Sequence, residues 1–584
     1  MYGGDMLRHS ITPGLEHLRE RSLNKGLAFS YKERFTLGLH GLMPCRVKTL
    51  REQVDWCKAR LSIIKDDLDK YLYLTELHAT NETLFFKVLT ENLVELLPIV
   101  YTPTVAQAVL KFGIIYRQLR ALYVNIYDKG NLEHVVRNWP QNEVQATVLT
   151  DGERCLGLGD MGVNSVCISV GKMGLYTALA GVKPHVCMPI VIDAGTNNPK
   201  LLEDPFYVGL KEKRVTGPKY DEFVDELLQA VVNRFTPRVL FQFEDFGNHN
   251  AFRYLEKYRN QYCCFNDDIQ GTAGVTVAGF LTSKRILGKQ LKDHKYLYLG
   301  AGEAAVGIAD LSCKLMVELE GLSLQEARSK IWMFDINGLL TKSRPEGLEE
   351  RQSVYAVDHA VNKDFLSVVN EFKPSVLIGV CTVGRTFTPA ILKAMGSFNE
   401  RPMIFALSNP NSKAECTPLE AYENTEGRAI YASGSPFGDV EYNGKIYKPG
   451  QGNNAYIYPG MALGGIIGAV RHISDDVEFL AAKCVCDCTT DEDLKVGSLY
   501  PPLSKIQDVS ANLAVKMLEY GLEKGICTIY PKPKDMMAYV KSRLYKFDYE
   551  DQLPRQWNYP EQKEVKLKST DITLALKFIS EGKK

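Results

Sequence analysis

The feature that most restricts the fold of this 584-residue chain is a short apolar run that ends in a glycine-rich turn. Tyr296 to Leu299 predicts a buried strand, Gly300 to Ala305 has the pattern Gly-x-Gly-x-x-Ala, and Val306 to Val317 has helical spacing. Without side chains at Gly300 and Gly302, a backbone can approach a pyrophosphate, whose charge the N–H groups of the helix would face. This order predicts a dinucleotide-binding α/β domain, although a purely structural turn can have the same pattern.

Later strands supply further candidates for the same domain. An acidic residue should end the next strand and hold the adenosine ribose, and Ile331 to Asp335 ends in one. It lies farther downstream than the usual interval of about 20 residues, so the crossover helix must be long. Two more strands, Val376 to Gly379 and Ile404 to Leu407, lead to polar residues that include Asn409, a candidate ligand contact. A competing match at Gly157 to Gly162 follows no continuous strand and opens no clear helix, so we reject it as the dinucleotide turn.

Composition excludes several classes of function. Lys plus Arg and Asp plus Glu both number 70, so zero net charge argues against nucleic acid or an anionic membrane as a partner. The Cys484, Cys486 and Cys488 cluster lacks the CxxC pairs of zinc sites and indicates packing, and the 14 cysteines together indicate reduced intracellular thiols. Ala455 to Val470 is too short to span a bilayer and predicts a buried loop and helix. Met1 to Ser22 resembles neither a signal peptide nor a clean mitochondrial presequence, so we expect an intracellular protein of the cytosol or the mitochondrial matrix.

The order of elements predicts helices first and α/β structure afterwards. Arg51 to about Phe112 has helical spacing, and we expect loops at Arg344 to Gly347 and at Gly434 to Gly450. Because the chain exceeds what one hydrophobic core supports, we expect several domains. After the helical region, apolar β-rich runs alternate with helical segments such as Tyr220 to Phe235. The runs are Ala146 to Leu149, Met188 to Ile192 and Val239 to Phe243.

Two pairs of acids follow core-like aromatic residues. They are Glu244 with Asp245, and Asp267 with Asp268. An unpaired buried charge costs several kcal/mol, so a cation is expected to neutralise them. Oxygen ligands without a Cys or His set favour Mg²⁺ or Mn²⁺ over zinc. Ordinary salt-bridged carboxylates explain the spacing equally well.

Several motifs together resemble the malic enzymes of animals, in unchanged order from about Asn24 to Pro560. The motifs are Val100 to Thr104, Thr150 to Arg154, Gly157 to Asp160, Phe241 to Asn248, Phe265 to Thr272, Gly300 to Ala305 and Gly450 to Asn454. The resemblance implies oxidative decarboxylation of L-malate to pyruvate and CO2 with NAD or NADP and a divalent metal, Mg²⁺ or Mn²⁺. It also implies a homotetramer built from dimers.

The resemblance further implies a role for individual residues. Lys172 would be the general base for the malate hydroxyl, oriented by Asp267, and Tyr101 the acid that protonates enolpyruvate. Arg154 would clamp a malate carboxylate with its planar fork. Metal ligands would be Glu244, Asp245 and Asp268; substrate contacts would be Arg154, Asn409, Asn453 and Asn454; cofactor contacts would be Gly300, Gly302, Glu303, Ala304, Ala305, Asp335 and Asn409. Without the resemblance, Lys172 and Tyr101 would be taken for a surface amine and a packed phenol.

The resemblance also implies a fold with four parts. They are a helical domain at 1–119, a discontinuous α/β domain at 120–266 and 454–526, a Rossmann-like dinucleotide domain at 267–453, and an extension at 527–584. The whole is therefore an α/β protein with a helical amino-terminal domain.

Cofactor preference and regulation depend on single positions. NADP-using relatives carry Ser after the ribose acid and a Lys downstream, where this chain has Ile336 and Gln352, so NAD is favoured. Lys342 and Arg344 could still serve a 2′-phosphate. Trp56 and Thr80 stand where fumarate-activated enzymes carry arginines, and neither side chain pairs with a dicarboxylate as Arg does. We therefore expect no fumarate activation through that site.

Three other functions remain open at this level. A 2-hydroxy-acid or amino-acid dehydrogenase would stop before decarboxylation. A catalytically silent NAD-binding protein would bind cofactor without metal-dependent turnover. A malolactic enzyme would form lactate without net NADH. Tyr101, Arg154, Lys172 and the four acids count against the first two.

Overall fold

The computed structural model describes residues 14–553 and residue 577, which form two compact units. Residues 14–53, 549–553 and 577 belong to the smaller unit, and 54–548 to the larger one. The smaller unit contains α2 (Gly14–Arg19) and α3 (Tyr31–Thr36). In it, the Lys25 ammonium lies 2.7 Å from a carboxylate oxygen of Glu33 and donates to the carbonyl of Glu550 at 3.1 Å. This contact joins its two separate stretches of chain.

A run of helices precedes the sheets, which confirms the helical region predicted from Arg51 to Phe112. Asp66 and Asn81 cap α5 and α6, because each side chain accepts a hydrogen bond from a backbone N–H in the first turn. Tyr101 follows α7 directly, so the end of this helix positions one predicted catalytic residue. The helices are α4 (Leu50–Ile63), α5 (Asp67–Thr80), α6 (Glu82–Glu91), α7 (Leu93–Val100) and α8 (Thr104–Ile115).

Five parallel strands form the first sheet, in the order β1-β3-β2-β4-β5. The predicted runs are confirmed as strands of this sheet. Phe243 of β4 pairs with Asn266 of β5, so the acids that follow the two strands emerge next to each other. The strands are β1 (Leu122–Asn125), β2 (Ala146–Thr150), β3 (Cys187–Asp193), β4 (Leu240–Glu244) and β5 (Cys263–Asn266). The helices between them are α9 (Leu132–Val136), α10 (Val166–Ala180), α11 (Pro199–Glu203), α12 (Pro218–Phe235) and α13 (Asn248–Tyr258).

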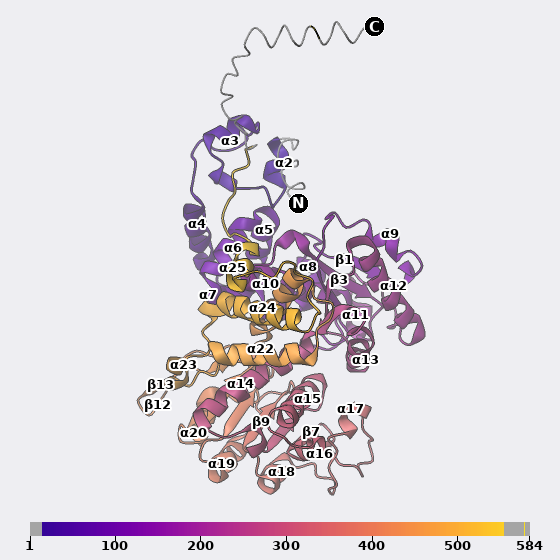
Figure 1. The fold of residues 1–584 in the computed structure, drawn as a ribbon, viewed down its shortest axis with the longest axis vertical. Coiled ribbons are helices and arrows are strands. Elements are labelled where there is room, and N and C mark those ends of the chain that lie inside the picture. Colours follow the sequence, from indigo (N-terminus) through magenta and orange to yellow (C-terminus); the bar gives the residue numbers. More distant parts are fainter. Residues whose placement is uncertain (1–13, 554–576, 578–584) are drawn as a thin grey trace. The chain divides into compact units, whose positions relative to one another are not determined.

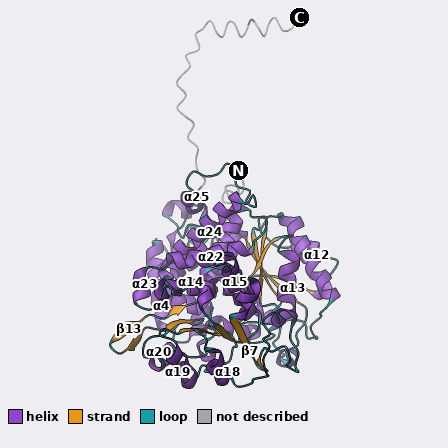
Figure 2. Ribbon diagram, turned by 60° about the horizontal axis from the view of Figure 1, so that its bottom comes forward, coloured by secondary structure: helices purple, strands orange, loops and turns teal. Residues whose placement is uncertain are grey.

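The second sheet has the order β14-β11-β10-β9-β6-β7-β8 and is parallel except for the β7–β8 pair. Figure 2 shows it between α14 and α15 on one side and α18, α19 and α20 on the other. The strands are β6 (Tyr296–Leu299), β7 (Ile331–Asp335), β8 (Gly338–Leu339), β9 (Val376–Gly379), β10 (Met403–Ala406), β11 (Ile430–Ser433) and β14 (Gly450–Gln451). The helices are α14 (Thr272–Leu287), α15 (Glu303–Glu318), α16 (Leu324–Ser329), α17 (Glu350–Ser353), α18 (Phe365–Phe372), α19 (Pro389–Phe398) and α20 (Pro418–Asn424).

The glycine-rich turn joins β6 to α15, as the sequence predicted. The crossover from β6 to β7 contains two helices, α15 and α16, and not the one long helix expected. The second helix explains why Asp335 stands so far downstream.

The C-terminal helices return to the first α/β region. Helix α10 packs against α21 and α24, and α22 packs against α14; Figure 1 shows α24 near α10 and α22 next to α14. The discontinuous domain and the four boundaries stay predictions. The apolar run at 455–470 is a buried loop and helix, as expected, and Cys484, Cys486 and Cys488 lie on α22. The helices are α21 (Tyr458–Gly468), α22 (Asp475–Cys488), α23 (Asp491–Lys495), α24 (Ile506–Glu523) and α25 (Met536–Arg543).

Two local predictions were wrong. The segment from Gly434 to Gly450, expected to be a loop, contains an antiparallel hairpin of β12 (Val440–Tyr442) and β13 (Lys445–Tyr447). Its turn residues, Asn443 and Gly444, both have positive φ, as the Asn-Gly turn of a two-residue hairpin requires. The segment at Gly157 to Gly162 does not follow a strand directly, as expected, because residues 151–156 separate it from β2. The expectation that no clear helix follows it was wrong, since a 3-10 turn at Gly162–Ser165 leads into α10.

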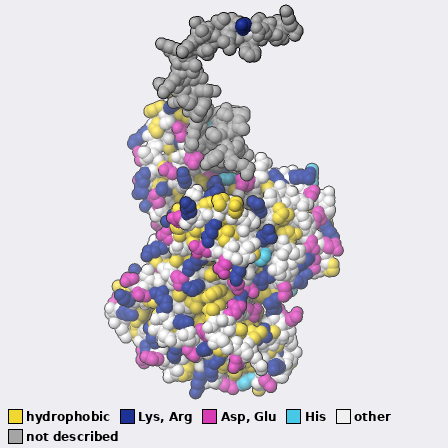
Figure 3. All heavy atoms as spheres, viewed as in Figure 1, with side chains coloured by type: hydrophobic (Ala, Val, Ile, Leu, Met, Phe, Trp, Pro, Cys, Tyr) yellow, Lys and Arg dark blue, Asp and Glu magenta, His cyan; other side chains and the backbone are white. Residues whose placement is uncertain are grey.

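The surface carries charges of both signs. On the face drawn in Figure 3, basic and acidic side chains are interspersed. No single described helix is long and apolar enough to cross a membrane, whereas α7 and α8, bent by 41°, pass such a test together by length and composition.

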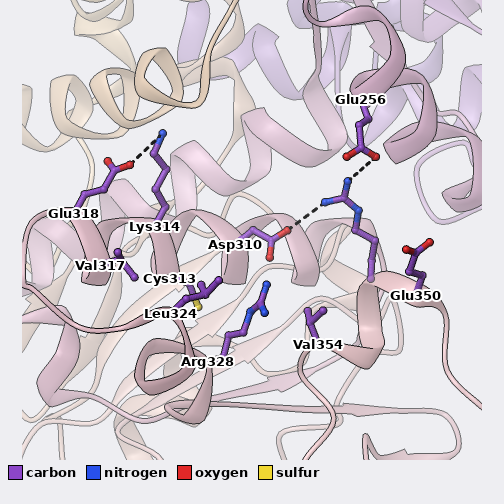
Figure 4. A pocket seen from close by; sticks show the side chains of 11 residues that line it. Glu256, Asp310, Cys313, Lys314, Val317, Glu318, Leu324, Arg328, Glu350 and Val354 are labelled. Atoms are coloured by element: carbon purple, nitrogen blue, oxygen red, sulfur yellow. Dashed lines mark hydrogen bonds and ion pairs between the residues drawn. The ribbon is translucent and has the colours of Figure 1, made fainter.

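A hollow between α13 and α15 is bridged by charged side chains (Figure 4). Arg351, from α17, lies 3.1 Å from a carboxylate oxygen of Glu256 on α13 and 3.9 Å from one of Asp310 on α15. The Arg351 guanidinium also lies 5.0 Å from the ring of Phe252. Elements of the two α/β regions are therefore in direct contact here.

Leu377, in the central strand β9, tests the core of the second sheet. It is fully buried, and Leu377→Ala should lower the free energy of unfolding by about 2–5 kcal/mol because the cavity cannot close completely. Urea denaturation followed by circular dichroism measures the change. Leu319→Ala is the control, since Leu319 is 59% exposed and its loss should be nearly neutral. Equal effects of the two substitutions would contradict this core assignment.

Candidate active site

One pocket collects residues that follow strands of both sheets. Glu244 ends β4, Asp268 follows β5, and Asn409 follows β10. The C-terminal ends of strands in open parallel sheets form the edge where ligands bind. Most predicted site residues line this pocket: Tyr101, Arg154, Lys172, Glu244, Asp245, Asp268, Glu303, Ala304, Asn409, Asn453 and Asn454. Five predicted residues do not line the pocket: Asp267, Gly300, Gly302, Ala305 and Asp335.

Lys172, on α10, is fully buried in the lining of the pocket. Its Nζ lies 2.8 Å from Oε1 of Glu244 and forms a still shorter ion pair with Oδ2 of Asp267. Burial lowers the pKa of Lys172, but the carboxylates of Asp267 and Glu244 raise it by more than burial lowers it. Its pKa therefore lies well above that of a free lysine. The amine is therefore charged here and held by two carboxylates.

Asp267 is fixed by its own environment. It begins a π-helical turn, Asp267–Gly271, that leads into α14. The side-chain amide of Asn454 donates to Oδ2 of Asp267 at 3.1 Å and to its backbone carbonyl at 3.2 Å. A Cβ on Gly271 would lie 1.8 Å from Oδ1 of Asp267, so only glycine leaves room for this carboxylate. Asn454, assigned to substrate, thus contacts the residue that holds Lys172.

Two tyrosines flank the lysine. Nζ of Lys172 lies 5.4 Å from the ring centroid of Tyr101 and 4.3 Å from that of Tyr458. Burial raises the pKa of Tyr101, Lys172 lowers it, and Glu244 raises it again, with a net shift upward that keeps the phenol protonated. Tyr458 was missed from the sequence, because it lies in an apolar run whose pattern indicates only packing.

The three predicted metal ligands lie at the ends of two neighbouring strands, β4 and β5. The backbone N–H of Asp245 donates to Oδ2 of Asp268 at 2.7 Å, and that of Leu156 donates to Oδ1 of Asp245 at 3.1 Å. Oδ2 of Asp245 is buried and accepts no hydrogen bond. Burial, together with the nearby charge of Asp268, raises the pKa of Asp245 to about 8. Burial also raises the pKa of Glu244 and of Asp268.

These carboxylates fit a hard divalent cation by their chemistry. Three acids with raised pKa values and one unsatisfied oxygen make a site that a cation would stabilise. Within residues 14–553, however, no group of three or more His, Cys, Asp or Glu side chains has the spacing of a formed metal site. Glu244 is instead engaged by Lys172.

Arg154 lies at the exposed side of the pocket. Its backbone N–H donates to the carbonyl of Asp245 at 3.1 Å, which links it to the acidic loop. A Cβ on Gly302 would lie 3.0 Å from Nη2 of Arg154. The guanidinium therefore reaches the glycine-rich turn and can meet an anion in the pocket.

The glycine-rich turn needs its glycines for close contacts. Gly300 has φ of +115°, and a Cβ there would lie 2.7 Å from the carbonyl oxygen of Val380. Glu303 is buried with one carboxylate oxygen that accepts no hydrogen bond, and burial, then Asp268, raises its pKa well above the ordinary value. Asp335 ends β7. Its Oδ1 and Oδ2 accept hydrogen bonds of 2.9 Å and 2.8 Å from Nη1 of Arg344.

The predicted asparagines take part in local hydrogen bonds. Oδ1 of Asn409 accepts from Ser435 at 2.8 Å, and Oδ1 of Asn453 accepts from the backbone of Ala455 at 2.8 Å. Thr382 and Ser408 also line the pocket, and neither was singled out from the sequence. Their only signal was their position directly after two parallel strands.

Fold and pocket together define an α/β oxidoreductase with a Rossmann-like dinucleotide domain. Residues 78–259 match the family model "Malic enzyme, N-terminal domain", and residues 269–522 match "Malic enzyme, NAD binding domain". The chain belongs to the malic enzyme family. It is thus an oxidoreductase that decarboxylates malate oxidatively with NAD or NADP.

Relatives of both cofactor types are similar to the chain over nearly its whole length. It is 47% identical to the NADP-dependent malic enzyme of Anas platyrhynchos, covering 94% of this chain and 98% of that one. It is also 47% identical to the mitochondrial NAD-dependent malic enzyme of Ascaris suum, over 94% and 86% of the two chains. The crystal structure of Entamoeba histolytica malic enzyme has the same fold, with a TM-score of 0.55 at 19% identity over 87% and 91% of the chains.

Gly271 offers a test of how Asp267 is held. Gly271→Ala should displace the Asp267 carboxylate and lower kcat for malate oxidation by about 100-fold, since small misplacements cost that much. Gly274→Ala, on α14, is the matched control, because its Cβ would meet Ile457 at an ordinary 3.5 Å. Steady-state kinetics with thermal melts separates the two. Similar kcat values for both variants would show that Asp267 tolerates the crowding.

Proposed function

We propose that the protein converts L-malate to pyruvate and CO2 with NAD as the preferred oxidant and Mg²⁺ or Mn²⁺ as the metal. The observation that carries this proposal is the buried Lys172, held by Asp267 and Glu244 in a pocket that also contains Tyr101 and Arg154. A buried amine beside carboxylates and a protonated phenol is what an acid–base reaction on a hydroxy acid requires.

Substrate binding is assigned to the open side of the pocket. Arg154 would bind one malate carboxylate through its planar guanidinium, in a bidentate geometry that lysine cannot reproduce. Asn409 and Asn453 would contact substrate or nicotinamide, and Asn454 would act through Asp267. The same pocket is lined by Glu303 and Ala304 of the glycine-rich turn, so a dinucleotide there would lie next to the substrate.

Glu244, Asp245 and Asp268 are the residues that would hold the metal. When bound, a divalent cation supplies positive charge that lowers the pKa of a hydroxyl and polarises a carbonyl. The unsatisfied oxygen of Asp245 and the raised pKa values of all three acids support this assignment. Release of Glu244 from Lys172 would also weaken one of the two interactions that keep the lysine charged.

The reaction needs two proton transfers, which are assigned to Lys172 and Tyr101. Lys172, once neutral, would accept the proton of the malate hydroxyl as hydride leaves for the nicotinamide, and oxaloacetate results. Asp267 would keep the amine oriented during this step. Decarboxylation then gives enolpyruvate, and Tyr101, whose raised pKa keeps it protonated, would donate a proton to its carbon.

Lys172→Ala tests the assigned base. It should abolish malate oxidation while NADH affinity stays nearly unchanged, because the lysine lies with the acids and not on the glycine-rich turn. Absorbance assays give kcat, and fluorescence titration gives the NADH Kd. Near-normal oxidation by a folded variant would remove Lys172 from this role.

The alternative functions predict different products. NADH and CO2 formed together from malate, and lost with a chelator, support the proposal. NADH without CO2 would indicate a simple dehydrogenase, lactate without NADH a malolactic enzyme, and cofactor binding without turnover a silent binding protein.

The preference for NAD is supported by two positions near Asp335. Ile336 is 99% exposed and offers no hydrogen bond to a 2′-phosphate. The amide of Gln352 donates to the carbonyl of Ala301 at 2.9 Å, so this side chain already engages the glycine-rich turn without bringing a charge. Arg344, which with Lys342 was a candidate for binding a 2′-phosphate, forms an ion pair with Asp335.

Gln352→Lys should shift the preference toward NADP, because it adds, beside the glycine-rich turn, a cation that can pair with a 2′-phosphate. The ratio of kcat/KM for NADP to that for NAD should rise by about ten-fold, equivalent to 1.4 kcal/mol. Gln290→Lys, at the capping residue of a short turn outside the pocket, is the control. An unchanged ratio would refute the assignment of Gln352.

Assembly, compartment and regulation complete the proposal. We expect a homotetramer of two dimers in the cytosol or the mitochondrial matrix. Trp56 lies on α4 and is 65% exposed, while Thr80 ends α5 and donates to the carbonyl of Glu76 at 3.0 Å. Neither supplies a cation, so activation by fumarate through these positions is not expected.

A further inference from the structure

Glu415 is a fully buried carboxylate that has no part in the proposed reaction. Its Oε1 accepts a short hydrogen bond from the hydroxyl of Ser408 and a 3.4 Å one from the backbone N–H of Cys381. Its Oε2 accepts from the backbone N–H of Ser408 at 3.3 Å. No Lys, Arg or His of the described chain forms an ion pair with it. Neutral donors alone therefore compensate its burial.

These donors belong to two different loops. Cys381 follows β9 and Ser408 follows β10, which are neighbouring parallel strands. The hydroxyl of Ser408, which donates to Glu415, also accepts from the backbone N–H of Thr382 at 2.9 Å. Glu415 and Ser408 thus join the loops 380–384 and 408–410 through one continuous set of hydrogen bonds.

Both loops form a wall of the pocket. Thr382 and Asn409 line it, and a Cβ on Gly157 would lie 3.0 Å from the methyl group of Thr382. Thr382 has φ of +58°, an unfavourable value for a β-branched residue that needs support from its surroundings. Gly379 makes room for the support, because a Cβ there would lie 2.3 Å from Cδ of Glu415.

We propose that Glu415 is a positioning residue that holds the loops 380–384 and 408–410 in the shape that receives the nicotinamide dinucleotide. This inference rests on the proposed function for the identity of the ligand. It assigns to Glu415 no contact with substrate or cofactor, since the residue acts through Ser408 and Cys381.

Glu415→Gln keeps the size of the side chain and changes only its hydrogen bonding. One acceptor oxygen becomes an NH2 group, which faces donors that then lose their partner. We expect the Kd for NADH, measured by fluorescence titration with Mg²⁺ present, to rise by about ten-fold, as for other supporting residues around a site. Arg154 is tied by its backbone N–H to Asp245 and not to these two loops, so the KM for malate should change less than the Kd for NADH.

Ser408→Ala provides a second variant, which removes the same contact from the side of the donor. It should weaken NADH binding in the same direction, and Glu415→Gln combined with Ser408→Ala should add little, because both substitutions break one shared contact. Glu33→Gln is the matched control. Glu33 is also buried and accepts from the backbone of Ser30 at 2.8 Å, but it belongs to the smaller unit, so NADH affinity should not change.

The outcomes separate the inference from the proposed function. An unchanged NADH Kd in folded Glu415→Gln overturns the inference, as does a parallel loss of affinity in Glu33→Gln. If Glu415→Gln does not fold, as judged by circular dichroism, an unchanged Kd in Ser408→Ala overturns it instead. A wild-type protein that binds NADH but leaves malate untouched would defeat the proposed function, while the NADH measurements would still decide the inference.

Discussion

The active-site side of this protein depends on one buried ion-pair cluster, Lys172 with Asp267 and Glu244. All three side chains are removed from water, so loss of one partner would leave an uncompensated charge, at a cost of about 3–5 kcal/mol. The cluster also joins parts that lie far apart in sequence, since the lysine lies on α10, Glu244 ends β4 and Asp267 follows β5. Its geometry therefore fixes where those helix and strand ends meet.

Supporting residues surround this cluster and also the loops 380–384 and 408–410, which form a wall of the pocket. Asn454 donates to Asp267, much as Ser408 donates to Glu415, and in each pair a glycine, Gly271 or Gly379, leaves the room that the carboxylate needs. Buried polar networks of this kind are worth keeping only when each donor and acceptor is satisfied. Oδ2 of Asp245 and Oε1 of Glu303 are two of the buried oxygens without a hydrogen bond, and both residues line the pocket, where a ligand would complete them. Oδ1 of Asp267 also has no partner among the described residues.

The sequence predicted much of the fold because both sheets have strong local signals. Apolar runs at 146–149 and 296–299 became strands, and the glycine-rich turn stands where its pattern indicates. The hairpin at Asn443-Gly444 was not predicted, although Asn-Gly is a local turn signal that needs no distant contact. Tyr458 and Glu415 could not be found, because their roles arise only when distant segments fold together and neither has a motif of its own. The metal ligands, the base and the cofactor preference remain proposals.

The placement of Asn454 has a consequence for how the enzyme is made. The chain leaves the ribosome from its N-terminus, so Lys172 and Asp267 are synthesised long before the amide that steadies the aspartate. Until α21 and α24 dock on α10, the lysine and its acids would lack the cover that keeps them from water. Catalytic competence should therefore arrive late in folding, after both sheets have formed, which leaves nascent chains unable to turn over substrate prematurely.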